Sequence, residues 1–134
     1  MNDNPDGTSN SEYKWENKTV LIAEDVNTNF VFIKRVLQNT KINIIYANNG
    51  KVAVELFQKN PSIDLILMDI EMPDTNGYEA TEIIRKQNTT IPIIAQTAYS
   101  FEEEKIKYAE SGFTDCLIKP ISRNSLLEIM SKYL

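Results

Sequence analysis

Acidic, hydroxyl and ammonium side chains follow several short apolar runs in this sequence, each at the point where a run ends. They are Glu24, Asp25, Asp69, Thr97 and Lys119. If the runs are parallel strands of one sheet, these side chains meet at the edge formed by the carboxyl ends of the strands. Carboxylates that crowd together repel one another, so they require a cation or protonation. Mg²⁺ is the natural cation, because it prefers a few carboxylates together with waters and a phosphate.

The same set of side chains suits phosphoryl transfer. That reaction needs a carboxylate nucleophile, a metal ion, and a lysine and a hydroxyl that hold the transferring oxygens. Each residue also has a plainer interpretation: Asp25 could cap a helix, Thr97 could be an ordinary strand residue and Lys119 could be a surface lysine. Their occurrence together, each at the end of an apolar run, favours the functional interpretation.

Two other acid-based sites fit less well. Pro73 and the spacing of the acids after Asp69 differ from a Ca²⁺-binding EF-hand loop. A pair of glycosidase carboxylates is conceivable among the same acids, but neither the expected fold nor the lysine gives a reason to prefer it.

Apolar runs alternate with helical patterns from residue 19 onward. The runs are rich in Ile, Leu and Val at successive positions, which is typical of strands buried on both faces of a parallel sheet. We expect strands at 19–23, 43–47, 64–68, 91–97 and 114–118. Apolar residues at spacings of three and four predict helices at 28–38, 51–59, 78–86, 100–110 and 123–133. This alternation predicts a doubly wound α/β fold with right-handed crossovers.

Two local motifs mark helix starts. Ser100 followed by Glu103 predicts a capping box at the start of the fourth helix. Asn76-Gly77 predicts a turn that begins the third helix, and we assign it no chemistry.

Length and composition limit the function classes. A chain of 134 residues fits one domain, and its formal net charge of −5 argues against a nucleic-acid-binding surface. The apolar runs are too short to cross a bilayer, and we expect no signal peptide. The single cysteine, Cys116, excludes an intrachain disulfide, and the absence of histidine excludes imidazole ligands and a self-supplied phosphohistidine. We therefore expect a cytosolic single domain.

Residues 1–17 differ in composition from the rest of the chain. They are rich in Asn, Ser, Asp and Gly and nearly free of aliphatic residues, which is typical of a disordered segment. We interpret them as a leader, a linker or a cloning remnant, with Tyr13 and Trp15 able to pack on the domain edge. The domain itself is expected at 18–134.

Several motifs, in this order, resemble those of the receiver domains of two-component response regulators. They are Glu24-Asp25, the segment Met68-Asp69-Ile70-Glu71-Met72-Pro73 with Asn76-Gly77 behind it, Thr97-Ala98 and Lys119-Pro120. The resemblance covers about residues 18–134, and the 25–29 segment is most similar to receivers of hybrid sensor histidine kinases. It implies a flavodoxin-like (βα)5 domain with a five-stranded parallel sheet in the order 2-1-3-4-5.

The resemblance also implies a metal site and a phosphoacceptor. Asp69 would accept the phosphoryl group. Asp25 and Asp69 would bind Mg²⁺ directly, Glu24 would bind it through water, and the backbone carbonyl of Glu71 would complete the protein ligands. Mn²⁺ could replace Mg²⁺.

The remaining site residues would act on the phosphoryl group itself. Lys119 would pair with the phosphoryl oxygens, and Thr97 would move to hydrogen-bond them. The small Ala98 would leave room for the phosphate, and the Lys119–Pro120 bond would be cis, which proline permits at low cost.

The implied function is a phosphoacceptor signalling switch. A histidine kinase or a histidine-containing phosphotransfer protein would phosphorylate Asp69, hydrolysis would reset the domain, and a change at the fourth strand and helix would carry the signal. We expect catalysis of its own phosphorylation and dephosphorylation but no separate substrate, no nucleic acid and no direct membrane contact; a homodimer is compatible with the family. The chain is expected in the cytoplasm, even where it is a fragment of a membrane-anchored hybrid kinase.

Two alternatives stay open at this point. One is a constitutive protein-interaction module that keeps the fold without being phosphorylated. The other is a stand-alone phosphotransferase or hydrolase with an aspartyl nucleophile, which a second acid at Glu71 supports only weakly.

The sequence departs from the family at two positions. Many receivers carry an aromatic residue three positions before the lysine, where this chain has Cys116; Tyr99, Phe101 and Tyr108 are candidates to replace that aromatic ring. Glu71 places a bulky acid two residues beyond Asp69. Its side chain is expected to alter the rate of dephosphorylation.

Overall fold

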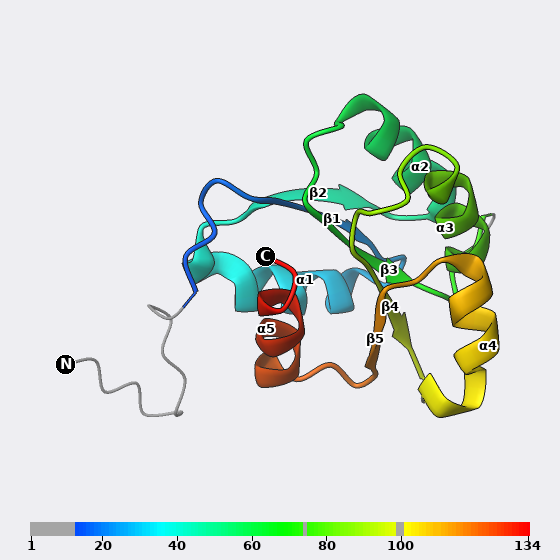
Figure 1. The fold of residues 1–134 in the computed structure, drawn as a ribbon. Coiled ribbons are helices and arrows are strands. Elements are labelled where there is room, and N and C mark those ends of the chain that lie inside the picture. Colours follow the sequence, from blue (N-terminus) through cyan, green and yellow to red (C-terminus); the bar gives the residue numbers. More distant parts are fainter. Residues whose placement is uncertain (1–12, 74, 99–100) are drawn as a thin grey trace.

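One parallel sheet forms the centre of the protein, and its strand order is β2-β1-β3-β4-β5 (Figure 1). The computed structural model describes residues 13–73, 75–98 and 101–134. The strands are β1 Thr19–Ala23, β2 Asn43–Ala47, β3 Leu65–Asp69, β4 Ile93–Thr97 and β5 Asp115–Ile118. The helices are α1 Asn27–Leu37, α2 Gly50–Lys59, α3 Gly77–Arg85, α4 Phe101–Ser111 and α5 Arg123–Ser131, with a 3₁₀ helix, η1, at Gln38–Thr40. The expected doubly wound (βα)5 fold and its strand order are confirmed.

The inner strands β1, β3 and β4 are buried on both faces because they are apolar at successive positions. Every residue of β3 and β4 is buried, and only Thr19 of β1 is partly exposed. Side chains that alternate along a strand enter hydrophobic clusters on opposite faces: Leu65 and Leu67 join one, and Ile66 and Met68 join the other. Burial of one such side chain contributes about 1.5–3 kcal/mol.

Helices cover both faces of the sheet. On one face, Ile33 of α1 and Leu126 of α5 belong to the same hydrophobic cluster. Helices α2, α3 and α4 cover the other face (Figure 1). They contribute Ala53, Ile84 and Tyr108 to the second cluster. Among the residues described, no helix has both the length and the apolar character that a membrane span requires.

The ends of the elements differ from the predicted ones by one or two residues, which is the usual uncertainty of helix and strand ends. β4 begins at Ile93 rather than at residue 91, because Pro92 has no backbone N–H to offer to the sheet. α3 begins where Asn76 and Glu79 form a capping box, so the turn predicted at Asn76-Gly77 is confirmed. Ser100 lies outside the described residues, and the capping box expected there stays a prediction.

Two residues that precede residue 18 pack against the rest of the domain. Only 8% of Trp15 is exposed, its backbone N–H donates to the carbonyl oxygen of Thr40 at 2.8 Å, and it belongs to the cluster between the sheet and helices α1 and α5. Tyr13 packs against the same cluster, with its ring centroid 5.3 Å from that of Trp15. Tyr13 and Trp15 therefore pack on the domain edge, as the sequence allowed, and the domain boundary at residue 18 stays a prediction. Residues 1–12 lie outside the described part, and their assignment stays a prediction.

Candidate functional site

Three carboxylates meet at the carboxyl ends of β1 and β3. Glu24, Asp25 and Asp69 each place a carboxylate oxygen within 4.8 Å of the others. β1 and β3 are neighbours in the sheet, and the pairing of Ala23 with Met68 puts Glu24 beside Asp69. Glu24 and Asp69 are buried, whereas Asp25 is exposed to solvent. The structure thus brings these acids together, as the strand-end argument predicts.

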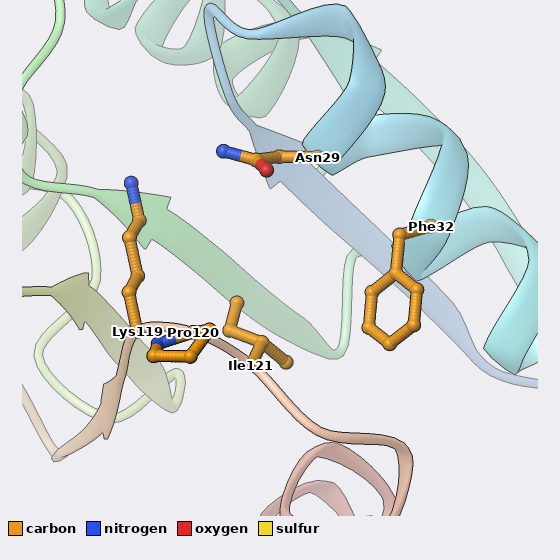
Figure 2. Close-up of a pocket in the computed structure, with 5 residues that line it drawn as sticks. All are labelled: Asn29, Phe32, Lys119, Pro120 and Ile121. Carbon is orange, nitrogen blue, oxygen red and sulfur yellow. The ribbon is translucent and has the colours of Figure 1, made fainter.

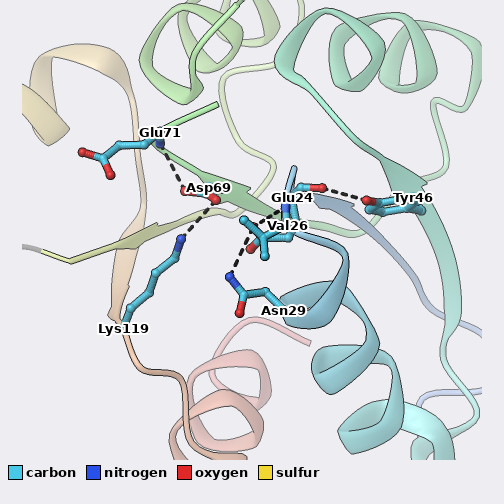
Figure 3. Close-up of polar contacts among 7 residues, drawn as sticks. All are labelled: Glu24, Val26, Asn29, Tyr46, Asp69, Glu71 and Lys119. Carbon is cyan, nitrogen blue, oxygen red and sulfur yellow. Dashed lines mark hydrogen bonds and ion pairs between the residues drawn. The ribbon is translucent and has the colours of Figure 1, made fainter. Parts of the chain in front are cut away.

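The Asp69 carboxylate is held at both oxygens. Lys119, which follows β5, places its Nζ 3.1 Å from Asp69 Oδ2, and the backbone N–H of Glu71 donates to Asp69 Oδ1 at 3.1 Å (Figure 3). Asp69 is only 2% exposed, so these two donors replace the water that a surface carboxylate would bind. The Lys119–Pro120 peptide bond is cis, as expected.

Glu24 is compensated on one oxygen only. Its Oε2 accepts hydrogen bonds from the backbone N–H of Val26 at 3.2 Å and from Asn29 Nδ2 at 3.5 Å (Figure 3). Its Oε1 is buried and has no hydrogen-bond partner among the described residues. Burial, followed by the neighbouring Asp69 carboxyl, raises the pKa of Glu24 to about 7. The side chain therefore needs a proton or a cation near neutral pH.

Two aromatic residues that the sequence did not single out fix the backbone of the acidic pair. The Tyr46 hydroxyl donates to the carbonyl oxygen of Glu24 at 2.8 Å (Figure 3), and Phe30 of α1 stacks on the Tyr46 ring with centroids 3.8 Å apart. A tyrosine at the end of an edge strand carries no pattern that would predict this contact.

Gly77 brings α3 against the end of β3. Its backbone N–H donates to the carbonyl oxygen of Ile70 at 2.9 Å, and a Cβ atom at this position would lie 2.3 Å from the carbonyl oxygen of Asp69. Only a residue without Cβ permits such an approach. Gly77, expected only to form a turn, therefore also supports the backbone that carries Asp69.

Thr97 and Glu71 lie near the acidic cluster without joining it. Thr97 is the last residue of β4, is 5% exposed, and accepts a hydrogen bond from the Tyr108 hydroxyl at 3.0 Å. The Glu71 side chain is exposed, and Figure 3 shows its carboxylate directed away from Asp69. Both residues line a cleft of about 340 Å³. The roles assigned to Thr97 and to the Glu71 carbonyl oxygen stay predictions.

The sheet order and the strand-end acids define a flavodoxin-like α/β domain with an acidic cluster at the carboxyl edge of its sheet. A family model described as the response regulator receiver domain matches residues 20–131. This chain therefore belongs to the response regulator receiver domain family of two-component phosphorelay systems.

Curated relatives place the chain among receivers of hybrid sensor kinases. The sensor histidine kinase GacS of Pseudomonas protegens is 34% identical over 119 residues, which are 85% of this chain and 13% of that protein. The hybrid signal transduction histidine kinase I of Dictyostelium discoideum is 42% identical over 120 residues, which are 84% of this chain and 7% of that protein. The chain thus spans a small part of the relatives that it matches.

Solved structures share the fold. The receiver domain of sensor histidine kinase PA1611 from Pseudomonas aeruginosa PAO1, with a magnesium ion coordinated in its active site cleft, has a TM-score of 0.79 and 30% identity over 87% of this chain and 96% of that one. The receiver domain of a response regulator from Saccharomyces cerevisiae also has a TM-score of 0.79 and 30% identity to this chain. The match covers 87% of this chain and 88% of the yeast one. That receiver was crystallised with its histidine phosphotransfer signalling protein.

Proposed function

We propose that this chain is a phosphoacceptor switch in which Asp69 receives a phosphoryl group from the phosphohistidine of a partner. The observation that carries the proposal is the environment of the Asp69 carboxylate. It lies 3.1 Å from Lys119 Nζ and shares an acidic cluster with Glu24 and Asp25. A carboxylate held in this way is a preorganised nucleophile, because little must move before it attacks.

The acidic cluster fits a divalent cation. Its members offer hard oxygen donors, and the buried Glu24 Oε1 lacks a hydrogen-bond partner among the described residues. Asp25 and Asp69 are the proposed direct ligands of Mg²⁺, with Glu24 acting through water and the Glu71 backbone carbonyl as a further ligand; Mn²⁺ is a proposed substitute. When bound, the ion neutralises charge on the acids and on the phosphoryl oxygens.

The transfer step forms one bond and breaks one. An Asp69 carboxylate oxygen attacks phosphorus, the P–N bond of the phosphohistidine breaks, and its electron pair returns to the imidazole of the partner. Lys119 holds the charge of the phosphoryl oxygens, and the Thr97 hydroxyl donates to one of them once the group has arrived. In the later hydrolysis a water oxygen attacks phosphorus, the P–O bond to Asp69 breaks, and the products are the free carboxylate, inorganic phosphate and a proton.

The donor of the phosphoryl group is proposed to be a histidine kinase or a histidine-containing phosphotransfer protein. The chain has no histidine, so the donor residue lies outside it. A groove of about 420 Å³ lies beside Lys119, between α1 and the segment after β5, and Phe32 and Ile121 give it an apolar wall (Figure 2). A protein that brings a phosphohistidine to Asp69 would contact this groove. The solved complex of a receiver with a phosphotransfer protein supports this class of partner.

Labelling with a small phosphodonor tests the proposal. The protein is incubated with acetyl phosphate and Mg²⁺, and its intact mass is measured. We expect the mass of one added phosphoryl group, which disappears with EDTA and in Asp69→Asn, because the amide is a poor nucleophile. Asp64→Asn is the matched control, since its carboxylate accepts from the backbone N–H of Thr19 at 2.8 Å, far from the site, and an amide oxygen can still accept.

Two outcomes would contradict the proposal. Wild-type protein that is folded but takes up no phosphoryl group would favour the constitutive interaction module. A label that persists in Asp69→Asn would place the phosphoacceptor elsewhere.

A further inference from the structure

Tyr46 holds the peptide bond between the two adjacent acids of the site. Its hydroxyl donates to the carbonyl oxygen of Glu24 at 2.8 Å (Figure 3), and the backbone N–H of Glu24 donates to the carbonyl oxygen of Ala47 at 3.0 Å. Both backbone groups of Glu24 are therefore bound by β2, the edge strand next to β1. Tyr46 is not one of the aromatic residues that the sequence singled out, of which Tyr99 and the side chain of Phe101 lie outside the described part of the chain.

The first turn of α1 fixes the Tyr46 ring. Phe30 stacks on it with centroids 3.8 Å apart and an interplanar angle of 22°. Asn29, the residue before Phe30, donates through its Nδ2 to Glu24 Oε2 at 3.5 Å. Two consecutive residues of α1 thus act on Glu24: one contacts its carboxylate, and the other supports the ring that holds its carbonyl oxygen.

Asp25 depends on this peptide more than the other two acids do. It is exposed to solvent in the loop between β1 and α1, whereas Glu24 and Asp69 are buried. Packing holds a buried side chain, but an exposed one keeps its rotamer freedom and is restricted mainly by the backbone that carries it. The Glu24 carbonyl group belongs to the same planar peptide unit as the Asp25 nitrogen. The Tyr46 hydroxyl therefore restricts the direction of the Asp25 carboxylate without touching it.

We propose that Tyr46 is a positioning residue for the divalent cation of the acidic cluster. This inference rests on the proposed function, in which Asp25 and Asp69 bind the ion directly. The ion requires its oxygen ligands in one arrangement, so a backbone already held in that arrangement binds it with a smaller loss of conformational freedom. Without the hydroxyl, the peptide before Asp25 samples other orientations, and the one that can bind is less populated. Loss of one such hydrogen bond should weaken Mg²⁺ binding about 2- to 10-fold.

Magnesium binding by Tyr46→Phe, measured by isothermal titration calorimetry without a phosphodonor, tests this role. The variant loses the hydroxyl but keeps the ring that stacks on Phe30. Its dissociation constant for Mg²⁺ should rise about 2- to 10-fold. The matched control is Tyr133→Phe, which also removes one hydroxyl hydrogen bond of 2.8 Å, to Asp115 Oδ2 of β5, a strand that carries none of the three acids. The control should bind Mg²⁺ as the wild type does.

The rate of labelling with acetyl phosphate, measured over a range of Mg²⁺ concentrations, separates positioning of the ion from a general weakening of the fold. In Tyr46→Phe the half-maximal rate should require about 2- to 10-fold more Mg²⁺. The rate at saturating Mg²⁺ should match that of the wild type, because the hydroxyl contacts no reacting group. A lower saturating rate with an unchanged half-saturating concentration would overturn the inference.

Phe30→Leu approaches the same contact from α1. It keeps the Tyr46 hydroxyl but removes the ring that supports it, and it should raise the dissociation constant in the same direction; this variant decides the question if Tyr46→Phe does not fold. Equal Mg²⁺ affinity in Tyr46→Phe and the wild type, or no Mg²⁺ binding by the wild type, would overturn the positioning role. Labelling of Asp69 that persists with equal affinities would leave the phosphoacceptor function standing. Mg²⁺ binding that weakens in Tyr46→Phe, while the wild type takes up no label, would support the positioning role and overturn the phosphoacceptor function.

Discussion

At the scale of single residues, the main free-energy cost at the site is the burial of negatively charged carboxylates. Asp69 is buried but compensated, by Lys119 on one oxygen and by a backbone N–H on the other. Glu24 is buried beside it and is compensated on one oxygen only. Removal of a carboxylate from water costs several kcal/mol unless a proton or a positive charge replaces the lost hydration. The cluster is therefore least favourable when it holds neither a proton nor a cation.

This imbalance predicts how the stability of the metal-free protein depends on pH. The pKa of Glu24 is raised from 4.5 to about 7, so between these values the folded protein keeps a proton that the unfolded chain has released. The free energy of unfolding should therefore fall as the pH rises through this window, by about 1–3 kcal/mol, and this contribution should be constant above it. Urea unfolding in EDTA at about pH 5 and about pH 8 measures the difference.

Glu24→Gln is the control for this pH dependence, because an amide does not titrate in this window. Its free energy of unfolding should vary less over the same window. Saturating Mg²⁺ should stabilise the wild type most at the higher pH, where the ion meets no competing proton. Equal pH dependence in the two proteins would show that Glu24 is not the group responsible.

At the scale of elements, the end of β3 and the start of α3 form one unit. The close approach of Gly77 to the backbone of Asp69 and Ile70 leaves no room for a side chain. The capping box of Asn76 and Glu79 fixes the first turn of α3 next to this contact. The direction of the Asp69 side chain thus depends on a helix that contributes no group to the chemistry.

Gly77→Ala tests that dependence. Its Cβ would overlap the carbonyl oxygen of Asp69, so the end of β3 must shift. We expect a loss of about 1–3 kcal/mol in stability and slower labelling of Asp69. Glu79→Ala weakens the start of the same helix without the overlap and should cost about 0.3–1 kcal/mol while labelling proceeds as in wild type. If both variants label at the wild-type rate, the approach of Gly77 supports stability only.

The helices and strands, and the meeting of the acidic side chains at one edge of the sheet, could be predicted from the sequence because both follow from local patterns. The apolar run before Asp69 predicts a buried strand, and parallel strands bring their carboxyl ends to one edge. The contact of Tyr108 with Thr97 and the approach of Gly77 to Asp69 could not be predicted, since they depend on how helices pack on the sheet. The spacing of apolar residues along the chain does not indicate which side chains of the helices contact the sheet.

At the scale of the whole molecule, the acidic cluster and the packed N-terminal residues lie at opposite ends of the sheet. The acids lie at the carboxyl ends of the strands, whereas Trp15 precedes β1 and lies at their amino ends. The composition of residues 1–17 is typical of a disordered segment, and Tyr13 and Trp15 are the residues of this segment that the sequence allows to pack on the domain edge. Buried Trp15 extends the cluster between the sheet and helices α1 and α5.

Trp15→Ala tests whether this packing is part of the domain. Loss of a buried indole should lower the free energy of unfolding by about 2–4 kcal/mol, measured by circular dichroism in urea. Tyr13→Ala, which removes the less buried neighbour, should cost less, and labelling of Asp69 should persist in both folded variants because the site lies at the other end of the sheet. Trp15 is the only tryptophan, so wild-type fluorescence should shift to longer wavelength at the same urea concentration as the circular dichroism transition. Emission typical of exposed tryptophan in the native protein, with no loss of stability in Trp15→Ala, would show that Trp15 is not part of the folded domain.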